Sequence, residues 1–279
     1  MKILVCGAGG MLGRDLVKAC ADAGHEVAGL ARAELDVTDA RAVRDAIAET
    51  QPETVLNCAA WTDVDGAEDH EADAQRVNGE GAGNVAAAAA GAGASVLYVS
   101  SDYVFDGSKA EPYVESDPTG PLSAYGRSKL AGERATAEAN PRHFVVRSSW
   151  LFGSHGPNFV ATMLRLGAER EELNVVDDQV GCPTWTGHLA TGLLEIAASG
   201  DHGIRHLAGA GETSWCGFAR EIFTRAGVDC DVRPITTAEY PLPATRPANS
   251  VLRSTRGFEL PPWQEGLERY LSERKALAA

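Results

Sequence analysis

The stretch Met1-Lys-Ile-Leu-Val-Cys-Gly-Ala-Gly-Gly-Met-Leu-Gly13 decides the fold of this 279-residue chain. Its first part, Lys2–Cys6, is a short apolar run that predicts a buried parallel strand. A loop with three evenly spaced glycines follows, and a helix is predicted from about Met11 to Ala23. Such a loop, here Gly7, Gly10 and Gly13, lets the backbone approach a pyrophosphate at the helix N-terminus. The spacing differs from G-x-G-x-x-G, so a tight turn used only for packing is the alternative.

Strand and helix patterns alternate after this unit. Further strands are predicted at Glu26–Leu30, Thr54–Cys58, Ser95–Ser100 and Phe144–Arg147, and helices at Asp39–Glu49, Asp73–Gly91 and Ala124–Ala139. This alternation predicts an α/β fold with a doubly wound, Rossmann-like parallel sheet. We therefore expect residues 1–150 to form an NAD(P)-binding domain.

The pattern changes after residue 150, where glycine, proline and asparagine become frequent. Helices are predicted at Phe159–Ala168, Gly187–Ala198, Trp215–Ala226 and Pro262–Leu277, strands at Leu173–Val176 and His206–Ala208, and a loop at Pro241–Pro247. These strands are too few for a second large sheet. We expect residues 151–279 to form mostly a smaller C-terminal substrate-binding subdomain, with segments that return to the first domain.

Composition limits the partners of the protein. A net charge of −14 argues against nucleic acid and against an anionic membrane surface. No apolar run is long enough to span a membrane, and the N-terminus lacks the features of a signal peptide, so we expect a cytoplasmic protein. The six cysteines and seven histidines show no zinc spacing, which favours free thiols and no metal site.

The stretch Tyr125-Gly-Arg-Ser-Lys129 predicts the chemistry. Tyr125 and Lys129 share one face of the predicted helix, where the ammonium could lower the pKa of the phenol. A tyrosine tuned in this way can donate a proton to a carbonyl. Ser101, at the end of a predicted strand, supplies a hydroxyl for the same oxygen. A lone Y-x-x-x-K is weak evidence, but with this serine and the glycine loop it predicts a carbonyl reductase.

Two more strand ends bear on the cofactor. Arg32 follows the second strand where a ribose-binding acidic residue is often found, which favours NADPH over NADH, although a surface arginine is the equal alternative. Leu35-Asp-Val37 lies close behind and is placed for the adenine side. The third strand ends at Asn57-Cys-Ala-Ala-Trp-Thr62, whose small residues would let a cofactor cross the strand ends.

Several blocks give the chain a family resemblance. They are Ser100-Ser-Asp-Tyr-Val-Phe-Asp-Gly107, Tyr125-Gly-Arg-Ser-Lys-Leu-Ala-Gly-Glu133, Arg147-Ser-Ser-Trp150, Asp178-Gln-Val-Gly-Cys-Pro-Thr184 and Arg246-Pro-Ala-Asn-Ser250. At these residues the chain resembles the extended short-chain dehydrogenase/reductase superfamily and, within it, the dTDP-4-dehydrorhamnose reductase family. The resemblance implies hydride transfer from NADPH, or NADH, to C4 of dTDP-4-dehydro-β-L-rhamnose, a dTDP-4-keto-6-deoxy sugar.

The resemblance also implies roles for single residues. Tyr125 would donate the proton, Lys129 would lower its pKa and hold the nicotinamide ribose, and Ser101 would polarise the C4 carbonyl in place of the usual threonine. Cofactor contacts would come from Gly10, Met11, Leu12, Asp36, Val37, Ala59 and Ala60, beside Gly7, Gly13 and Arg32. Substrate contacts would come from Thr62, Ser101, Asp102, Tyr125, Trp150 and Arg246.

Departures from the family pattern leave some alternatives open. Asp15 and Gly187 stand where some members hold Mg²⁺ between subunits with glutamates, so we expect no metal, in a monomer or homodimer. Asp102-Tyr103 lacks the glutamate of a 4,6-dehydratase, and an epimerase is not excluded by the triad alone. The remaining alternatives are a reductase of another dTDP-4-ketosugar, as in dihydrostreptose-type antibiotic pathways, and a noncatalytic regulatory subunit of the methionine adenosyltransferase type.

Overall fold

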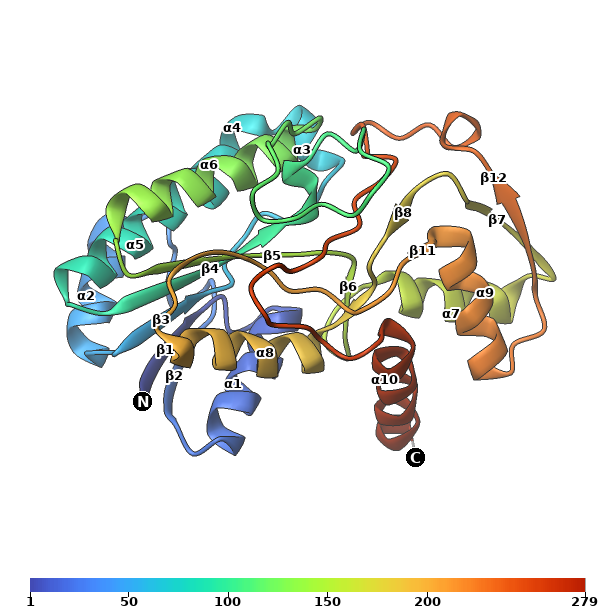
Figure 1. Ribbon diagram of the computed structural model, residues 1–279. Coiled ribbons are helices and arrows are strands. Elements are labelled where there is room, and N and C mark those ends of the chain that lie inside the picture. The colour runs from blue at the N-terminus through green and yellow to red at the C-terminus, as the bar shows by residue number, and fades with distance from the viewer. Residues whose placement is uncertain (279) are drawn as a thin grey trace.

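A six-stranded parallel sheet forms the centre of the computed structural model, which describes residues 1–278 (Figure 1). The strand order is β10-β5-β4-β3-β1-β2, and every neighbouring pair is parallel. The strands are β1 (Lys2–Cys6), β2 (Glu26–Leu30), β3 (Thr54–Asn57), β4 (Ser95–Ser101), β5 (His143–Ser148) and β10 (Gly203–His206). This sheet confirms the predicted Rossmann-like class.

Helices cover both faces of the sheet (Figure 1). One face carries α1 (Met11–Asp22) and α8 (Thr186–Ser199), whose leucines pack with the inner strands in one core. The other carries α2 (Ala40–Thr50), α5 (Gly81–Gly91) and α6 (Ala124–Ala139). A parallel sheet with connections on both sides buries its strands completely, which accounts for the continuous apolar run of β1.

The helix expected over Asp73–Gly91 is present, with a π-helical turn inside it. Helix α4 (Glu71–Gln75) leads into the turn at Arg76–Glu80, which leads into α5, and the short helix α3 (Gly66–Asp69) precedes them. The buried Asn78 side chain in this turn binds the backbone of Trp61 and donates to the Ser128 hydroxyl at 2.8 Å. Such turns bend a helix locally, and here the turn serves these tertiary bonds.

A second lobe is built from α7 (Phe159–Glu169), α9 (Trp215–Ala226), α10 (Trp263–Ala278), and a parallel pair of β7 (Glu172–Val176) and β12 (Asp231–Ile235). Short pairs connect it to the sheet: β6 (Leu151–Phe152) with β9 (Thr184–Trp185), and β8 (Val180–Gly181) with β11 (Thr213–Ser214). Single 3₁₀ turns lie at Asp102–Val104 and Thr237–Glu239. The second lobe has its own apolar core, which includes Phe218 and Trp263.

Two strands of the second half differ from the expectations: one is displaced and one was not predicted. The strand expected at His206–Ala208 lies at Gly203–His206, and it extends the large sheet by pairing with β5. The sequence did not predict β12, which contains Pro234. Because β12 pairs only with β7, its other edge tolerates a residue without an N–H. Within residues 1–278, none of the helices has the length and apolar character needed to cross a membrane.

Candidate active site

The glycine loop is tightly packed against the end of β3. Gly7 has a φ of 78°, and a Cβ at this position would lie 2.7 Å from the Ala59 nitrogen. A Cβ at Gly13 would collide with the Gly7 carbonyl oxygen. Both positions therefore require glycine. The backbone of the loop, the start of α1 and Ala59 are held within a few ångströms of one another.

The first turn of α1 offers unpaired donors at this loop. Gly10 is its N-cap and makes no side-chain cap bond. The N–H groups of Met11, Leu12 and Gly13 have no backbone or side-chain acceptor among residues 1–278. Free N–H groups and the positive end of a helix together bind phosphate well. The chain thus fits a pyrophosphate at the predicted place.

The end of β2 holds the other expected cofactor residues. Arg32 is exposed two residues after the strand and forms no ion pair with any residue that the structure describes. The Asp36 carboxylate accepts from the Thr38 N–H at 2.9 Å and hydroxyl at 2.8 Å, and the backbone bond in particular lowers its pKa. Val37 is buried. Arg32 is therefore the cationic side chain available at this strand end.

Ser101 and Tyr125 lie side by side. Ser101 ends β4, where its hydroxyl donates to Asp102 Oδ1 at 3.0 Å and accepts from the Tyr103 N–H at 3.2 Å. Tyr125 lies in the first turn of α6, which Ser123 caps. Burial raises the pKa of Tyr125 to about 12, the Ser101 hydroxyl opposes this shift, and the Asp102 charge adds to it.

Lys129 lies one turn further along α6 and is 2% exposed. Its Nζ donates to the Val99 carbonyl oxygen at 2.7 Å and lies 4.2 Å from the centre of the Tyr98 ring. Burial lowers the pKa of Lys129 to about 7, against the influence of Glu133. The expected lowering of the Tyr125 pKa is absent here, because burial dominates at the phenol and the ammonium is directed at Val99.

A buried ion pair behind Lys129 was not predicted from the sequence. Glu133 accepts from Arg147 Nε at 2.8 Å and Nη2 at 2.7 Å, and from the Ser100 hydroxyl at 2.6 Å. The side chains of the two charged residues are 5% and 3% exposed. The sequence carried no signal for this pair, because Glu133 and Arg147 meet only through the packing of α6 on β5.

Asp102 is the most unusual acidic group near the site. It is 2% exposed, and its Oδ2 has no hydrogen-bond partner among the described residues. Burial raises the pKa of Asp102 to about 7, although the Ser250 and Ser101 hydroxyls oppose the shift. A buried carboxyl without a cation favours its neutral form.

Two expected substrate residues, Thr62 and Arg246, lie at the loop that follows β3. Thr62 is exposed after β3, and its side chain makes no hydrogen bond to residues 1–278. Arg246 is 15% exposed and forms a two-bond pair with Asp65, with distances of 3.0 and 2.7 Å. Asp65, which the sequence did not single out, therefore engages the guanidinium that was expected to contact substrate.

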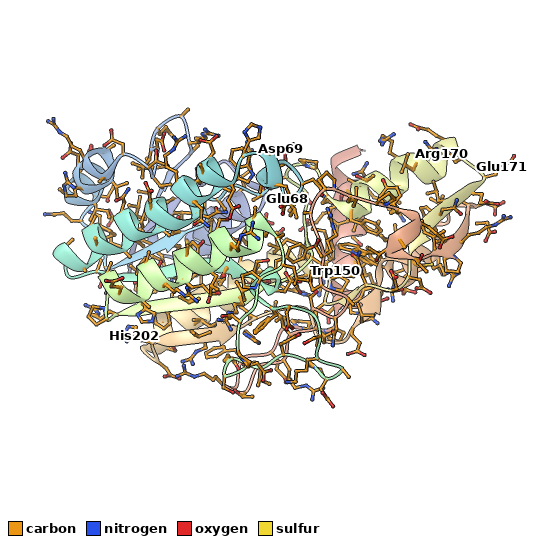
Figure 2. The ribbon with its side chains drawn as sticks, turned by 90° about the horizontal axis from the view of Figure 1, so that it is seen from above. Glu68, Asp69, Trp150, Arg170, Glu171 and His202 are labelled. Carbon is orange, nitrogen blue, oxygen red and sulfur yellow. The ribbon has the colours of Figure 1, made fainter. Side chains whose placement is uncertain are left out.

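Trp150 lies between the two lobes, whereas Arg170 and Glu171 mark the far end of the second lobe (Figure 2). The Trp150 indole stacks on the Trp215 indole, with ring centres 3.4 Å apart and an angle of 4° between the ring planes. Trp215 belongs to α9. The sequence predicted Trp215 only as the start of a helix and assigned it no role.

Two other features lie apart from these residues. Asp15 accepts from the Thr186 hydroxyl, and a Cβ at Gly187 would lie 2.5 Å from the Trp185 ring. Among the described residues, no group of three or more His, Cys, Asp or Glu could hold a metal.

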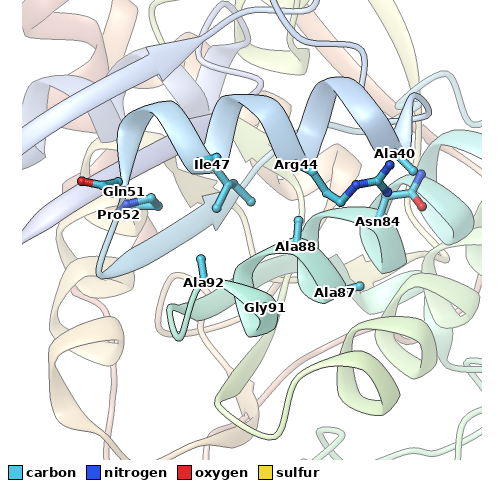
Figure 3. A pocket seen from close by; sticks show the side chains of 11 residues that line it. Ala40, Arg44, Ile47, Gln51, Pro52, Asn84, Ala87, Ala88, Gly91 and Ala92 are labelled. Atoms are coloured by element: carbon cyan, nitrogen blue, oxygen red, sulfur yellow. The ribbon is translucent and has the colours of Figure 1, made fainter.

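A groove of about 640 Å³ lies between α2 and α5 (Figure 3), and none of the expected site residues lines it.

Comparison with known proteins gives a consistent result. The family model described as the RmlD substrate binding domain matches residues 1–276. A dTDP-4-dehydrorhamnose reductase of Streptomyces griseus is 48% identical over 260 residues, 91% of this chain and 86% of the relative. A dTDP-4-keto-6-deoxy-D-glucose reductase of Streptomyces niveus is 43% identical over 251 residues, 89% of this chain and 87% of the relative.

A solved structure is similarly close. It is a dTDP-4-dehydrorhamnose reductase from Bacillus anthracis in complex with NADP, with a TM-score of 0.95 and 38% identity, covering 98% of this chain and 100% of that one. The likeness therefore extends over both lobes. Because the family model and these relatives match almost the whole chain, the protein belongs to the RmlD substrate binding domain family.

Proposed function

We propose that this protein is an NAD(P)H-dependent reductase that converts the C4 ketone of dTDP-4-dehydro-β-L-rhamnose to the alcohol of dTDP-β-L-rhamnose. The observation that carries the proposal is that Ser101 and Tyr125 lie side by side at the carboxyl end of β4, with Lys129 one turn further along α6. Relatives that match almost the whole chain bear the name of this activity.

The cofactor fits residues of this chain. The pyrophosphate would rest on the N–H groups of Met11, Leu12 and Gly13, with Gly7 and Gly10 shaping the loop. Asp36, Val37, Ala59 and Ala60 would line the remainder of the site, and Arg32 would meet a 2′-phosphate. We therefore favour NADPH, as in the complex of the Bacillus anthracis protein. The bound dinucleotide supplies the hydride.

Proton transfer falls to Tyr125. Its raised pKa keeps the phenol protonated at neutral pH, which a proton donor requires. The Ser101 hydroxyl would donate a hydrogen bond to the same C4 oxygen, and this requires it to turn from Asp102. The Lys129 ammonium donates one of its three N–H groups to the Val99 carbonyl, which leaves donors for the nicotinamide ribose. Thr62, Asp102, Trp150 and Arg246 would bind the sugar nucleotide.

A second candidate substrate has direct support. The Streptomyces niveus relative is named for dTDP-4-keto-6-deoxy-D-glucose, and it is nearly as similar as the first. The same three residues would reduce either ketone. A noncatalytic regulatory role has no comparable support. The division at residue 150, a monomer or homodimer and a cytoplasmic location stay predictions from the sequence.

One experiment separates these substrates. A 4,6-dehydratase supplies dTDP-4-keto-6-deoxy-D-glucose, and a 3,5-epimerase is added in a parallel sample to form the L-rhamno ketosugar. Oxidation of NADPH and of NADH is then followed separately in each. We expect turnover mainly with the epimerase present and with NADPH. Turnover without it favours the second substrate, and no oxidation in any sample contradicts the reductase.

The proton donor is tested in the same assay. Tyr125→Phe removes the phenolic hydroxyl and keeps the ring, so we expect kcat to fall by about 10²-fold or more while cofactor affinity is unchanged. Tyr240→Phe, on an exposed tyrosine, is the matched control and should behave as the wild type. Full activity of Tyr125→Phe would exclude Tyr125 as the donor.

A further inference from the structure

Trp150 adopts a backbone conformation that tryptophan rarely uses. Its φ is 48°, and Gln51 is the one other non-glycine residue with positive φ in the described part of the chain. Gln51 ends helix α2, where this conformation is common, whereas Trp150 connects β5 to β6. A strained residue persists only when its surroundings hold it in place, and such residues gather at functional sites.

The surroundings of the Trp150 ring come from one small sheet. A Cβ at Gly181 would lie 2.5 Å from Trp150 Cε2, so only glycine leaves room for the ring. Gly181 in β8 pairs with Thr213 in β11, and Trp215 follows two residues later. The β8–β11 pair thus brings together the glycine that admits the indole and the indole that stacks on it.

Trp215 is itself fixed by the second lobe. Its Nε1 donates to Gln179 Oε1 at 3.2 Å, and Gln179 is 5% exposed and donates in turn to the Thr237 hydroxyl at 3.0 Å. Phe159 packs on the same indole, with ring centres 4.6 Å apart. Trp215 therefore has a bonded, inflexible position, as a support requires.

Trp150 differs in this respect. Its Nε1 makes no hydrogen bond to any residue that the structure describes, and this nitrogen is accessible to solvent. The half-buried indole therefore retains a donor and free surface at the junction of the lobes (Figure 2). An accessible indole N–H without a partner in the chain can donate to a ligand, and the ring offers it an apolar face.

From these contacts we propose that Trp215 is a positioning residue, which holds the strained Trp150 indole in place as a preformed wall for the ketosugar. The inference rests on the proposed function, in which Trp150 binds the sugar nucleotide. The hydrogen bond and ring contacts of Trp215 are made with Gln179, Trp150 and Phe159, and among the described residues none of them involves Ser101, Tyr125 or Lys129. Its loss should therefore weaken binding of the ketosugar more than it slows the chemical step.

The test compares three replacements of Trp215 in the full chain. Trp215→Ala removes the stack, Trp215→Leu keeps bulk without an aromatic face, and Trp215→Phe keeps an aromatic face. We expect KM for the ketosugar to rise roughly tenfold in the Ala and Leu variants, with kcat changed less than threefold, and to recover largely in Phe. NADPH affinity, measured by calorimetry, should be unchanged in all three.

A matched control addresses general damage to the second lobe. Trp263→Phe trims an indole of the same lobe core that packs edge-on against Phe218 and has no stack with Trp150. Its KM should stay at the wild-type value. Should the Ala variant not fold, the Leu and Phe variants carry the same comparison.

The outcomes separate this inference from the reductase function. Wild-type turnover together with an unchanged KM in the Leu variant would overturn the role of Trp215 and leave the reductase intact. An equal rise of KM in the Phe and Leu variants would also overturn it, because it would show that the aromatic face is irrelevant. Absence of wild-type turnover with either ketosugar would overturn both.

Discussion

At the scale of single residues, Asp102 shows how burial changes an ordinary side chain. Its identity and its place after Ser101 could be read from the sequence, but its exposure could not. The carboxyl is almost fully buried, and it forms no ion pair with any described residue. Burial raises its pKa to about 7, so that it titrates in the range where the protein would work.

Asp102 should make stability depend on pH. Its ordinary pKa is 3.8, so between that value and about 7 the native state holds the proton more often than the unfolded state. The free energy of unfolding therefore falls as pH rises through this window. Asp102→Asn does not titrate, and its stability relative to the wild type should increase by a few kcal/mol from about pH 4 to about pH 7, then level off.

Urea unfolding of both proteins at a series of pH values measures this difference. Asp106→Asn is an informative control, because the pKa of Asp106 is lowered. Its carboxylate accepts hydrogen bonds, of which the one from the Ser108 backbone N–H has the largest effect. The stability of Asp106→Asn relative to the wild type should fall as pH rises toward about 4 and then stay constant, so it should show no rise between about pH 4 and about pH 7. A difference for Asp102→Asn that is independent of pH would show that this carboxyl titrates normally.

At the scale of elements, a buried ion pair joins helix α6 to the sheet. Helix geometry places Tyr125 and Lys129 on one face, and the sequence sufficed to predict this. The sequence did not indicate that Glu133 on the same helix would pair with Arg147 of β5, because their contact depends on how α6 packs on the strands. The β12 strand was missed for a related reason, since its pairing with β7 overrides the low strand propensity of Pro234.

Glu133→Gln tests the contribution of the Glu133–Arg147 ion pair to stability. Glutamine keeps the shape and removes the charge, leaving the Arg147 guanidinium buried without its counter-ion. We expect a loss of about 3–5 kcal/mol in the free energy of unfolding, measured with urea. Glu138→Gln, on the exposed side of the same helix, should change it by less than about 0.5 kcal/mol. Equal losses in both variants would mean that the buried pair has no special importance.

At the scale of the whole molecule, an ion pair joins distant segments. Asp65 from the loop after β3 holds Arg246 and also accepts from the Ala244 N–H at 3.1 Å. The arginine was predicted from the family resemblance as a substrate residue, but its partner was not, because 181 residues separate the two in the chain. Alternating patterns predicted the central sheet, whereas the second lobe depends on such long-range contacts.

Removing Asp65 should loosen this segment. Asp65→Ala deprives the Ala244 amide of its acceptor, so its hydrogen exchange should accelerate roughly tenfold or more. Mass spectrometry of exchanged peptides that cover residues 240–250 measures the change. Asp69→Ala, a replacement in neighbouring helix α3, should leave these peptides unaltered. Unaltered exchange in Asp65→Ala would show that other contacts suffice to hold Ala244.

The position of β10 has a consequence for how such a protein can evolve. The chain leaves the large sheet after β5, builds much of the second lobe, and then returns to complete the edge of the sheet with residues 203–206. Gene fusion or exchange that cut after residue 150 would leave β5 with an open edge able to pair with foreign strands. The two lobes should therefore be inherited together, and new substrate preferences should arise by point substitution within the second lobe.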